Sequence, residues 1–316
     1  MRVLVTGGAG FIGSHIAECL LQRGDDVMVI DDLSSGRADN VPTGADFEAV
    51  RIGESTVAKA FHRFRPHTVV HAAAQVSVAS SMKDPAADAR ANIVGGLDVV
   101  RSAADVGCSR FVFLSSGGAL YGNVARPASE ADAAQPLSPY GVSKWAFERY
   151  LTVIAPPDMR WISLRLANVY GPRQRSDGEG GVVSVFAASM SQGRPVEIHG
   201  DGRQTRDFVY VTDVVGAVVS ALEFGGNGVF NIGTGRATSI LDLFRTLASI
   251  TSYGLVPSHV PPRAGDVGTS VLDIGLARRE LRWQPEVGLR EGLLATVAAL
   301  QDDVTREAQS PDGSRP

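Results

Sequence analysis

Short apolar runs alternate with longer amphipathic segments through the first half of the chain. The apolar runs predict buried strands at 2–6, 26–30, 46–50, 68–72, 110–115 and 161–166. The segments between them repeat apolar residues at helical spacing and predict helices at 12–23, 54–64, 86–106 and 139–154. This alternation predicts an α/β fold, a Rossmann-type doubly wound parallel sheet with helices on both faces.

The second half is less regular, because Gly and Pro interrupt shorter elements. The pattern predicts helices at 182–192, 212–224, 238–250 and 288–300, and strands at 196–198, 207–210 and 229–232. We expect a first domain over 1–167, with segments near 212–235 returning to its sheet, and a smaller α/β part over 168–300. Residues 301–316 are polar with Pro, Gly and Ser, which predicts a disordered tail.

Composition excludes several classes of protein. The 316 residues are 44% hydrophobic, which suffices for a large core, and the net charge of −4 provides no basic stripe for nucleic acid. No apolar run reaches the roughly 18 residues of a membrane span. Cys19 and Cys108 fit neither a disulfide framework nor a metal site, and the first strand follows directly on Met1, so we expect a cytoplasmic protein without a signal peptide or metal.

A glycine-rich turn joins the first strand to the first helix. Gly8-x-Gly10-x-x-Gly13 follows the run that begins at Val3, and Gly7 precedes it. Glycines here allow a tight turn, let a pyrophosphate approach the backbone and let the helix pack closely on the strand. The N–H groups at the helix N-terminus then face the phosphates. This stretch therefore predicts a dinucleotide site.

Asp31 ends the second strand, about 20 residues after the glycines, as the dinucleotide pattern requires. A carboxylate at this position accepts hydrogen bonds from both ribose hydroxyls and repels a 2′-phosphate. NAD is therefore favoured over NADP. Arg37 lies six residues later and could soften that preference.

Tyr140 and Lys144 form the second chemical motif, since four residues on a helix put both side chains on one face. A phenol is a poor base at its usual pKa of about 10. A lysine ammonium and a positive nicotinamide nearby would favour the phenolate and lower that pKa. Ser115 and Ser116 end the preceding strand, where ligands bind in doubly wound sheets, and one of them could hydrogen-bond the reacting oxygen.

With these motifs in place, the chain resembles the extended short-chain dehydrogenase/reductases of the NAD-dependent epimerase/dehydratase family, and within it the UDP-glucose (UDP-galactose) 4-epimerases. The similarity runs from Met1 to about Ala299. It rests on the stretches 6–15, 31–36, 71–75, 138–144, 168–174, 200–208, 231–235 and 262–266. The first four are typical of the superfamily and of NAD binding, and the later ones of nucleotide-sugar enzymes.

The resemblance implies roles for individual residues. It implies that NAD is held along its length by Gly7, Gly10, Phe11, Ile12, Gly13, Asp31, Asp32, Ser35, Ala72, Ala73, Ala74, Asn92, Tyr140 and Lys144. It implies catalysis by Tyr140, Lys144 and Ser116, with Ser115 as the alternative hydroxyl. It implies that the UDP-sugar is bound by Ser116, Asn168, Arg175, Val182, Val183, His199, Arg206, Arg263 and Asp266. Arginine forks suit two phosphates, and a carboxylate suits a ribose diol.

Two stretches depart from the family pattern. The loop after Ser116 reads Gly-Gly-Ala-Leu-Tyr and is one residue longer than the commonest form, which leaves Ser115 as an alternative to Ser116. An adenine-binding Asp often follows the third strand, but here the chain reads Arg51-Ile-Gly, so that contact is in doubt.

The loop after Ser116 also indicates which of the family's reactions the chain catalyses. Dehydratases and decarboxylases of this kind need an acidic residue after the catalytic hydroxyl, whereas Gly117 and Gly118 transfer no proton. The sequence therefore favours NAD-dependent 4-epimerisation of a UDP-hexose (UDP-glucose/UDP-galactose) through a transient 4-keto sugar.

Other substrates and functions stay open. Arg175 stands where the uronate epimerases of the family place an arginine on the C6 carboxylate, and the small Ser270 could leave room for an N-acetyl group. UDP-glucuronate and UDP-N-acetylhexosamine are therefore alternatives. A non-catalytic NAD-binding scaffold is disfavoured by the presence of Tyr140 and Lys144. The resemblance also implies a homodimer formed through the helices at 86–106 and 139–154.

Overall fold

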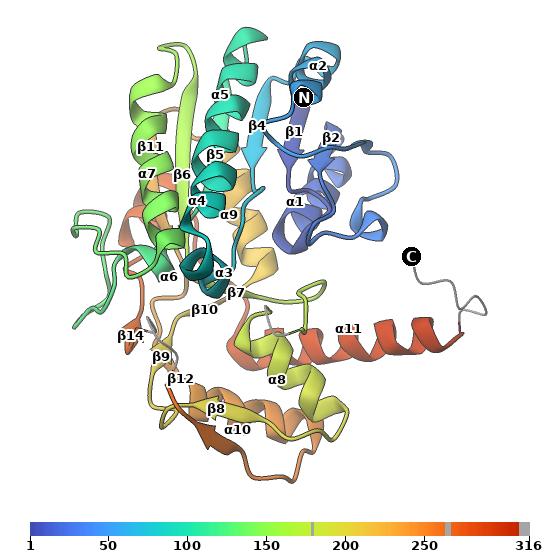
Figure 1. Cartoon of the computed structure of the whole chain (residues 1–316), viewed down its shortest axis with the longest axis vertical. Coiled ribbons are helices and arrows are strands. Elements are labelled where there is room, and N and C mark those ends of the chain that lie inside the picture. The colour runs from blue at the N-terminus through green and yellow to red at the C-terminus, as the bar shows by residue number, and fades with distance from the viewer. Residues whose placement is uncertain (178–179, 263–266, 310–316) are drawn as a thin grey trace.

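The computed structural model describes residues 1–177, 180–262 and 267–309 (Figure 1). Its larger part is built on a seven-stranded parallel sheet in the order β11-β6-β5-β4-β1-β2-β3. The strands are β1 (Arg2–Thr6), β2 (Asp26–Asp31), β3 (Asp46–Ala49), β4 (Thr68–His71), β5 (Arg110–Ser116), β6 (Arg160–Leu166) and β11 (Gly228–Ile232). The predicted doubly wound α/β fold is confirmed.

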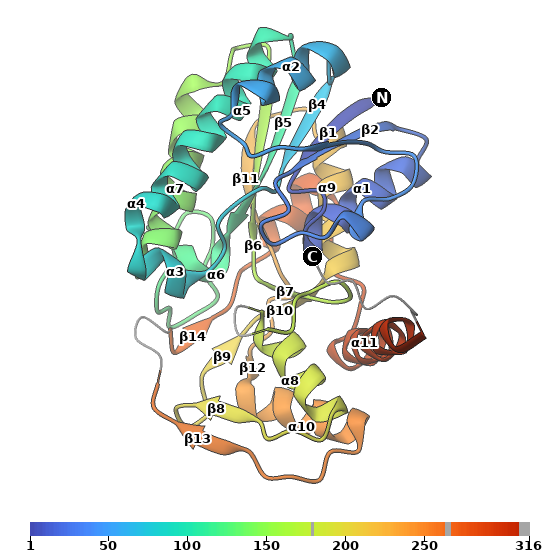
Figure 2. The same cartoon turned by 45° about the vertical axis from the view of Figure 1, so that its right-hand side comes forward.

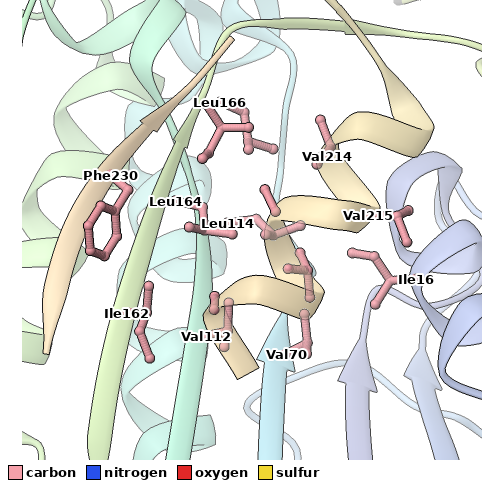
Figure 3. Close-up of a cluster of buried hydrophobic side chains, with 14 of the residues drawn as sticks. Ile16, Val70, Val112, Leu114, Ile162, Leu164, Leu166, Val214, Val215 and Phe230 are labelled. Atoms are coloured by element: carbon pink, nitrogen blue, oxygen red, sulfur yellow. The ribbon is translucent and has the colours of Figure 1, made fainter. Parts of the chain in front are cut away.

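Helices cover both faces of this sheet. One face carries α1 (Phe11–Gln22) and α9 (Val211–Glu223), and the other carries α2 (Ser55–Phe64), α5 (Gly95–Asp105) and α7 (Pro139–Ile154) (Figure 2). Side chains alternate between the faces with period two. Val3 and Val5 belong to the cluster under α1 and α9, drawn in Figure 3, while Leu4 belongs to the cluster under the other helices. Both faces of β1 are buried, which is why its run from Val3 to Val5 is apolar without a break.

The helix predicted over 86–106 is interrupted. It consists of α4 (Pro85–Ala89), a π-helical turn η2 (Arg90–Val94) and α5. The Asp84 side chain caps α4 by accepting a hydrogen bond from Ala87 N at 2.8 Å. Two short helices were not predicted, α3 (Val78–Lys83) and α6 (Gly117–Leu120), and both lie at the carboxyl edge of the sheet (Figure 1).

The smaller part packs around its own apolar cluster, which includes Phe186, Ile198, Leu243 and Leu293. Its helices are α8 (Val182–Ser191), α10 (Ile240–Thr251) and α11 (Leu289–Gln309). Its short strands are β7 (Asn168–Tyr170), β8 (Glu197–His199), β9 (Thr205–Arg206), β10 (Phe208–Tyr210), β12 (Thr238–Ser239), β13 (Ser258–Val260) and β14 (Thr269–Ser270). Two further turns lie in the larger part, the 3-10 helix η1 (Ala38–Asn40) and the π-helical η3 (Ala277–Leu281).

The C-terminal helix is longer than predicted. α11 continues to Gln309, beyond the helix predicted at 288–300. The disordered tail expected over 301–316 stays a prediction. Its last part, 310–316, lies outside the described residues. In the larger part, α9 packs on the sheet and β11 pairs with β6, although both follow residue 168 in the chain. The division at residue 167 stays a prediction.

The strand order reverses between β1 and β4. From β1 the chain runs outward through β2 and β3, then crosses back to β4 and continues to the other edge. Ligands of doubly wound sheets bind outside the carboxyl ends of the strands at such a reversal. Those ends face the smaller part of the molecule (Figures 1 and 2).

Candidate active site

The glycine turn lies at this reversal and is too crowded for side chains. Gly7 has a φ of +71°, and a Cβ there would lie 2.6 Å from the backbone nitrogen of Ala73. A Cβ on Gly13 would lie 2.1 Å from the carbonyl oxygen of Gly7. Gly10 is the N-cap residue of α1, and no side chain caps that N-terminus. The half-buried Phe11 and Ile12 follow in its first turn. The turn therefore has the tight backbone and open helix end that a pyrophosphate requires.

Asp31 stands beside this turn at the end of β2 and is 8% exposed. Its carboxylate accepts hydrogen bonds from the backbone nitrogens of Ala9 at 3.0 Å and Leu33 at 2.9 Å. Burial raises the pKa of Asp31, and those hydrogen bonds oppose the rise. The carboxylate is thus fixed in place next to the glycines, where a ribose would lie.

The neighbouring Asp32 binds Arg51, which stands where the family pattern often has an Asp. The Arg51 guanidinium donates through Nε to Asp32 Oδ2 at 2.9 Å. Asp32 also accepts a hydrogen bond from Ser34 N at 3.0 Å, and Ser35 follows as an exposed residue. Hydrogen bonds from Ser34 and Arg51 outweigh desolvation and lower the pKa of Asp32. Arg51, found where an Asp is common, therefore contributes positive charge at the adenosine end.

The loop after β4 crosses the glycine turn. Ala72 N donates to the Thr6 carbonyl at 3.0 Å, and Ala73 N to Thr6 Oγ1 at 3.3 Å. Ala72, Ala73 and Ala74 are all half-buried. The two segments predicted to line the cofactor, far apart in the sequence, thus lie side by side.

The predicted catalytic residues converge on the next strand end. Ser138 caps α7 by accepting a hydrogen bond from Gly141 N at 3.2 Å, which places Tyr140 in the first turn of the helix. The Ser116 side chain, at the end of β5, lies close enough to the Tyr140 phenol to affect its pKa. Ser115 Oγ is buried and has no hydrogen-bond partner within the described part of the chain. Because successive side chains alternate along a strand, only one of these serines faces the phenol, and the geometry favours Ser116.

Lys144 lies one turn beyond Tyr140 and is 4% exposed. Its Nζ lies 4.4 Å from the centroid of the Phe113 ring, a cation–π contact. Burial lowers the pKa of Lys144 to about 7, and the charge of Asp88 acts in the opposite direction. Burial also raises the pKa of Tyr140, with the Ser116 side chain opposing the rise. The lowered phenol pKa expected from the sequence is therefore not produced by these protein groups.

Asn92 lies in the π-helical turn and ties three segments together. Its Nδ2 donates to the Gln75 carbonyl and to Ser143 Oγ, both at 3.0 Å, and its Oδ1 accepts from Gln75 N at 2.8 Å. Gln75 Nε2 donates to Asp88 Oδ1 at 2.8 Å. Sequence reasoning gave no role to Asp88 or Ser143. The spacing of four residues from Asp88 to Asn92 was the available signal, because it puts both on one helix face.

On the side of the smaller part, Asn168 is the first residue of β7, and within the described residues its side-chain oxygen is free to accept a hydrogen bond. Its Oδ1 is buried and has no hydrogen-bond partner among the described residues. Gly118 borders it, since a Cβ on Gly118 would lie 3.7 Å from Asn168 Oδ1 and 3.9 Å from Ser270 Oγ. Ser270 is in register with Arg206 across β14 and β9. Asn168, Ser270 and Arg206 thus lie next to the turn that follows Ser116.

The remaining predicted substrate residues are spread over the smaller part. Val182 and Val183 begin α8, and His199 ends β8 with its Nδ1 3.1 Å from the Pro261 carbonyl oxygen. Arg175 is half exposed and its guanidinium pairs with Asp177. Arg263 and Asp266, predicted to hold the nucleotide, lie outside the described residues.

Comparison with known proteins agrees with this arrangement. The NAD dependent epimerase/dehydratase family matches residues 3–233, most of the chain. The chain belongs to this family. UDP-glucose 4-epimerase from Mycolicibacterium smegmatis is 43% identical over 305 residues, covering 94% of this chain and 97% of the relative.

Two solved structures are similar throughout. The crystal structure of UDP-glucose 4-epimerase with UDP-glucose from Thermotoga maritima has a TM-score of 0.94 at 46% identity, covering 96% of this chain and 100% of that one. UDP-glucose 4-epimerase from Thermus thermophilus in complex with NAD has a TM-score of 0.90 at 43% identity, covering 95% and 99%. The predicted resemblance is confirmed.

Proposed function

We propose that this family member is an NAD-dependent isomerase that epimerises UDP-glucose and UDP-galactose at C4 through a transient 4-keto sugar. The observation that carries the proposal is the convergence of Ser116 and Tyr140, close enough for the serine side chain to act on the phenol, one turn before the buried Lys144. A non-catalytic NAD-binding protein needs no such arrangement. The relatives named UDP-glucose 4-epimerase support the choice of substrate.

The residues at the reversal fit NAD, because the crowded Gly7 and Gly13 leave only backbone at the open end of α1. Gly10, Phe11 and Ile12 complete the pyrophosphate turn, while Asp31, Asp32 and Ser35 surround the adenosine ribose. Ala72, Ala73, Ala74 and Asn92 continue toward the nicotinamide, and Lys144 holds its ribose. When bound, NAD accepts and returns a hydride and puts a positive ring near the phenol.

The chain's own side chains handle the protons. Tyr140 takes the proton of the sugar 4-hydroxyl and later returns a proton to the same oxygen on the other face of the sugar. Ser116 holds that oxygen by a hydrogen bond, and Lys144 supports the phenolate with its charge. The sugar turns about its pyrophosphate link between these two proton transfers. The following turn, Gly117–Leu120, has no acid or base, which argues against dehydration and decarboxylation.

The nucleotide and sugar are assigned to the smaller part. Asn168, Val182, Val183, His199, Arg206, Arg263 and Asp266 hold the UDP moiety in this proposal. The pairing of Arg175 with Asp177 favours a neutral hexose, because the aspartate offsets the charge that a uronate would need. UDP-glucuronate and UDP-N-acetylhexosamine remain alternatives for the test below.

The experiment is proton NMR of the purified protein mixed separately with UDP-glucose, UDP-glucuronate and UDP-N-acetylglucosamine. No NAD is added at first. We expect the anomeric signal of UDP-galactose to appear in the first tube only. A deoxy-keto or pentose product would contradict the proposal, as would an unchanged UDP-glucose signal after NAD is supplied. Turnover of UDP-glucuronate alone would reassign the sugar and make Arg175 the next residue to change.

We also propose a homodimer. An apolar stripe on η2 and α7 remains exposed, with Val94 at 51%, Val142 at 46%, Trp145 at 38% and Val153 at 81%. Exposed apolar patches of this kind mark interaction surfaces. Light scattering after size-exclusion chromatography should give twice the chain mass, and Trp145→Glu should reduce it to one. A monomeric native protein would refute the dimer.

A cytoplasmic location belongs to the same proposal. The described thiols, Cys19 and Cys108, are both free, which suits a reducing compartment. Over the described residues, the helices include none with the length and apolar character to pass through a bilayer. Fractionation of cells that produce the protein would test the location.

A further inference from the structure

Asp88 is a buried carboxylate to which the proposed chemistry assigns no task. It lies on α4, is 1% exposed and forms no ion pair within the described residues. Its Oδ1 accepts hydrogen bonds from Gln75 Nε2 at 2.8 Å and Asn92 Nδ2 at 3.2 Å, whereas its buried Oδ2 has no partner in the described part of the chain. A buried carboxylate without a countercharge is costly.

Hydrogen bonds connect this carboxylate to α7. Asn92 Nδ2 also donates to Ser143 Oγ, and Ser143 Oγ donates to the carbonyl of Tyr140, each at 3.0 Å. Ser143 stands immediately before Lys144, so the chain of contacts ends on the turn that carries both catalytic side chains. The groups that meet Asp88 Oδ1 are both side-chain N–H donors.

The groups around Lys144 leave Asp88 as its counterion. His71 on β4 faces it as a neutral ring, since burial, followed by the charge of Lys144, lowers the pKa of His71 to about 3. Phe113 on β5 presents a ring face. On α7 itself, Tyr140 is uncharged as the phenol, and Glu148 is bound to Arg165. Asp88 on α4 is the carboxylate whose charge acts on Lys144.

We propose that Asp88 is a positioning residue that keeps Lys144 protonated, through the charge of a buried carboxylate fixed by Gln75 and Asn92 and linked through Ser143 to α7. Burial lowers the Lys144 pKa to about 7 even with this carboxylate acting in the opposite direction, so removal of the carboxylate should lower that pKa further. The catalytic consequence rests on the proposed function, but the charge state of Lys144 does not.

Asp88→Asn isolates the charge. The amide oxygen can take the place of Oδ1 and accept the same two hydrogen bonds, while the amide nitrogen replaces the unpartnered Oδ2. Shape and packing are therefore preserved. Asp88→Glu is the rescue variant, because it restores the charge and the neighbouring groove lined by Met82, Pro85 and Ile93 offers room. Asp98→Asn is the matched control, since it removes a half-exposed carboxylate from α5 that pairs with Arg101.

The measurement is an NMR pH titration of the NAD-loaded protein labelled at lysine. The chain has three lysines, Lys59, Lys83 and Lys144, so each gives a resolved signal, assigned with Lys144→Arg. We expect the Lys144 midpoint in Asp88→Asn to fall by about one pH unit or more. Asp98→Asn should leave it unchanged, and Asp88→Glu should return it to within roughly half a unit of the native value.

An unchanged Lys144 midpoint in Asp88→Asn, or an equal fall in Asp98→Asn, would overturn the inference. If Asp88→Asn fails to fold, a native-like Lys144 midpoint in Asp88→Glu supports it and a lowered one contradicts it. If UDP-glucose turns over, Asp88→Asn should lose about tenfold in kcat at pH 8.5 and less than about threefold at pH 6. A uniform loss across pH would mean a merely structural role. Absence of turnover in the native protein would count against the proposed function and not against the lysine titration.

Discussion

Glu148 on α7 and Arg165 on β6 form an ion pair that is closed to solvent. Glu148 is fully buried and Arg165 is 5% exposed, with Arg165 Nε 3.1 Å from Glu148 Oε2. Ser163 donates to the same oxygen at 2.9 Å, and Arg165 also donates to the Tyr121 hydroxyl at 2.6 Å. The catalytic helix is thus fastened to the sheet one turn beyond Lys144.

Glu148→Gln should be strongly destabilising, because it leaves the Arg165 guanidinium buried without a countercharge. We expect a loss of about 3–5 kcal/mol in the free energy of unfolding, measured by urea titration. Arg245→Gln, which breaks the exposed pair with Asp242, should leave the unfolding midpoint nearly unchanged. Similar losses in the free energy of unfolding in both variants would show that the buried pair stabilises the fold no more than the exposed pair does.

Tyr140→Phe should abolish most of the turnover while leaving the fold intact, because it removes the hydroxyl that moves the proton. We expect at least about a hundredfold loss in kcat for UDP-glucose, with NAD still bound. Tyr150→Phe is the control on the same helix, since Tyr150 is 47% exposed, and it should retain native rates. Near-native activity of Tyr140→Phe would rule out the assigned base.

Variants of the two adjacent serines test which hydroxyl acts on Tyr140. Ser116→Ala removes the side chain that acts on the Tyr140 phenol, so kcat should fall about 10- to 100-fold. Ser115→Ala changes a buried hydroxyl that has no hydrogen-bond partner in the described part of the chain, and its kcat should stay close to native. The opposite ranking would make Ser115 the reacting hydroxyl and would require a different conformation at the end of β5.

Local pattern was sufficient to predict the sheet. Val3, Leu4 and Val5 read as a buried strand because both faces of β1 are covered, and β4 behaves in the same way. The edge strand β3 has no buried residue. The glycine turn and the spacing from Tyr140 to Lys144 could also be predicted from the sequence, because each depends on residues of a single turn or helix.

What the sequence could not supply depends on distant segments. Gln75, Asp88 and Ser143 belong to three elements that meet only in the folded chain, so no local period relates them. The choice between Ser115 and Ser116 needed the orientation of β5, because the longer loop made the count ambiguous. Residues 301–309 are polar and read as a tail, yet they continue α11, whose start packs on the smaller part.

Gly13→Ala should weaken NAD binding. Its methyl group would have to occupy space 2.1 Å from the Gly7 carbonyl oxygen, which forces α1 away from the glycine turn. We expect at least about a tenfold rise in the NAD dissociation constant, measured by calorimetry on cofactor-stripped protein. Gly225→Ala, where nothing lies within 4 Å of the added Cβ, should bind as the native protein does. Equal affinities would mean that the turn does not hold the pyrophosphate.

His71 should make the fold sensitive to acid. It is 1% exposed, lies between Phe113 and Phe147, and its Nδ1 lies 2.7 Å from Thr6 Oγ1. Burial, with a smaller effect of Lys144, lowers its pKa from 6.5 to about 3. Between pH 6.5 and about 3 the imidazole is protonated in the unfolded chain but neutral in the folded chain. The free energy of unfolding therefore decreases as the pH falls through this window, by up to about 5 kcal/mol.

The test compares urea unfolding of native protein, His71→Asn and His62→Asn from pH 8 to pH 4.5. His71→Asn should be less stable at pH 8, because it loses ring packing, but its stability should fall less steeply on acidification. His62 is exposed on α2, so His62→Asn should keep the native slope. The difference in slope removes the contribution of the carboxylates that all three proteins share. Parallel curves for native protein and His71→Asn would mean that His71 takes up its proton in the folded state at an ordinary pH.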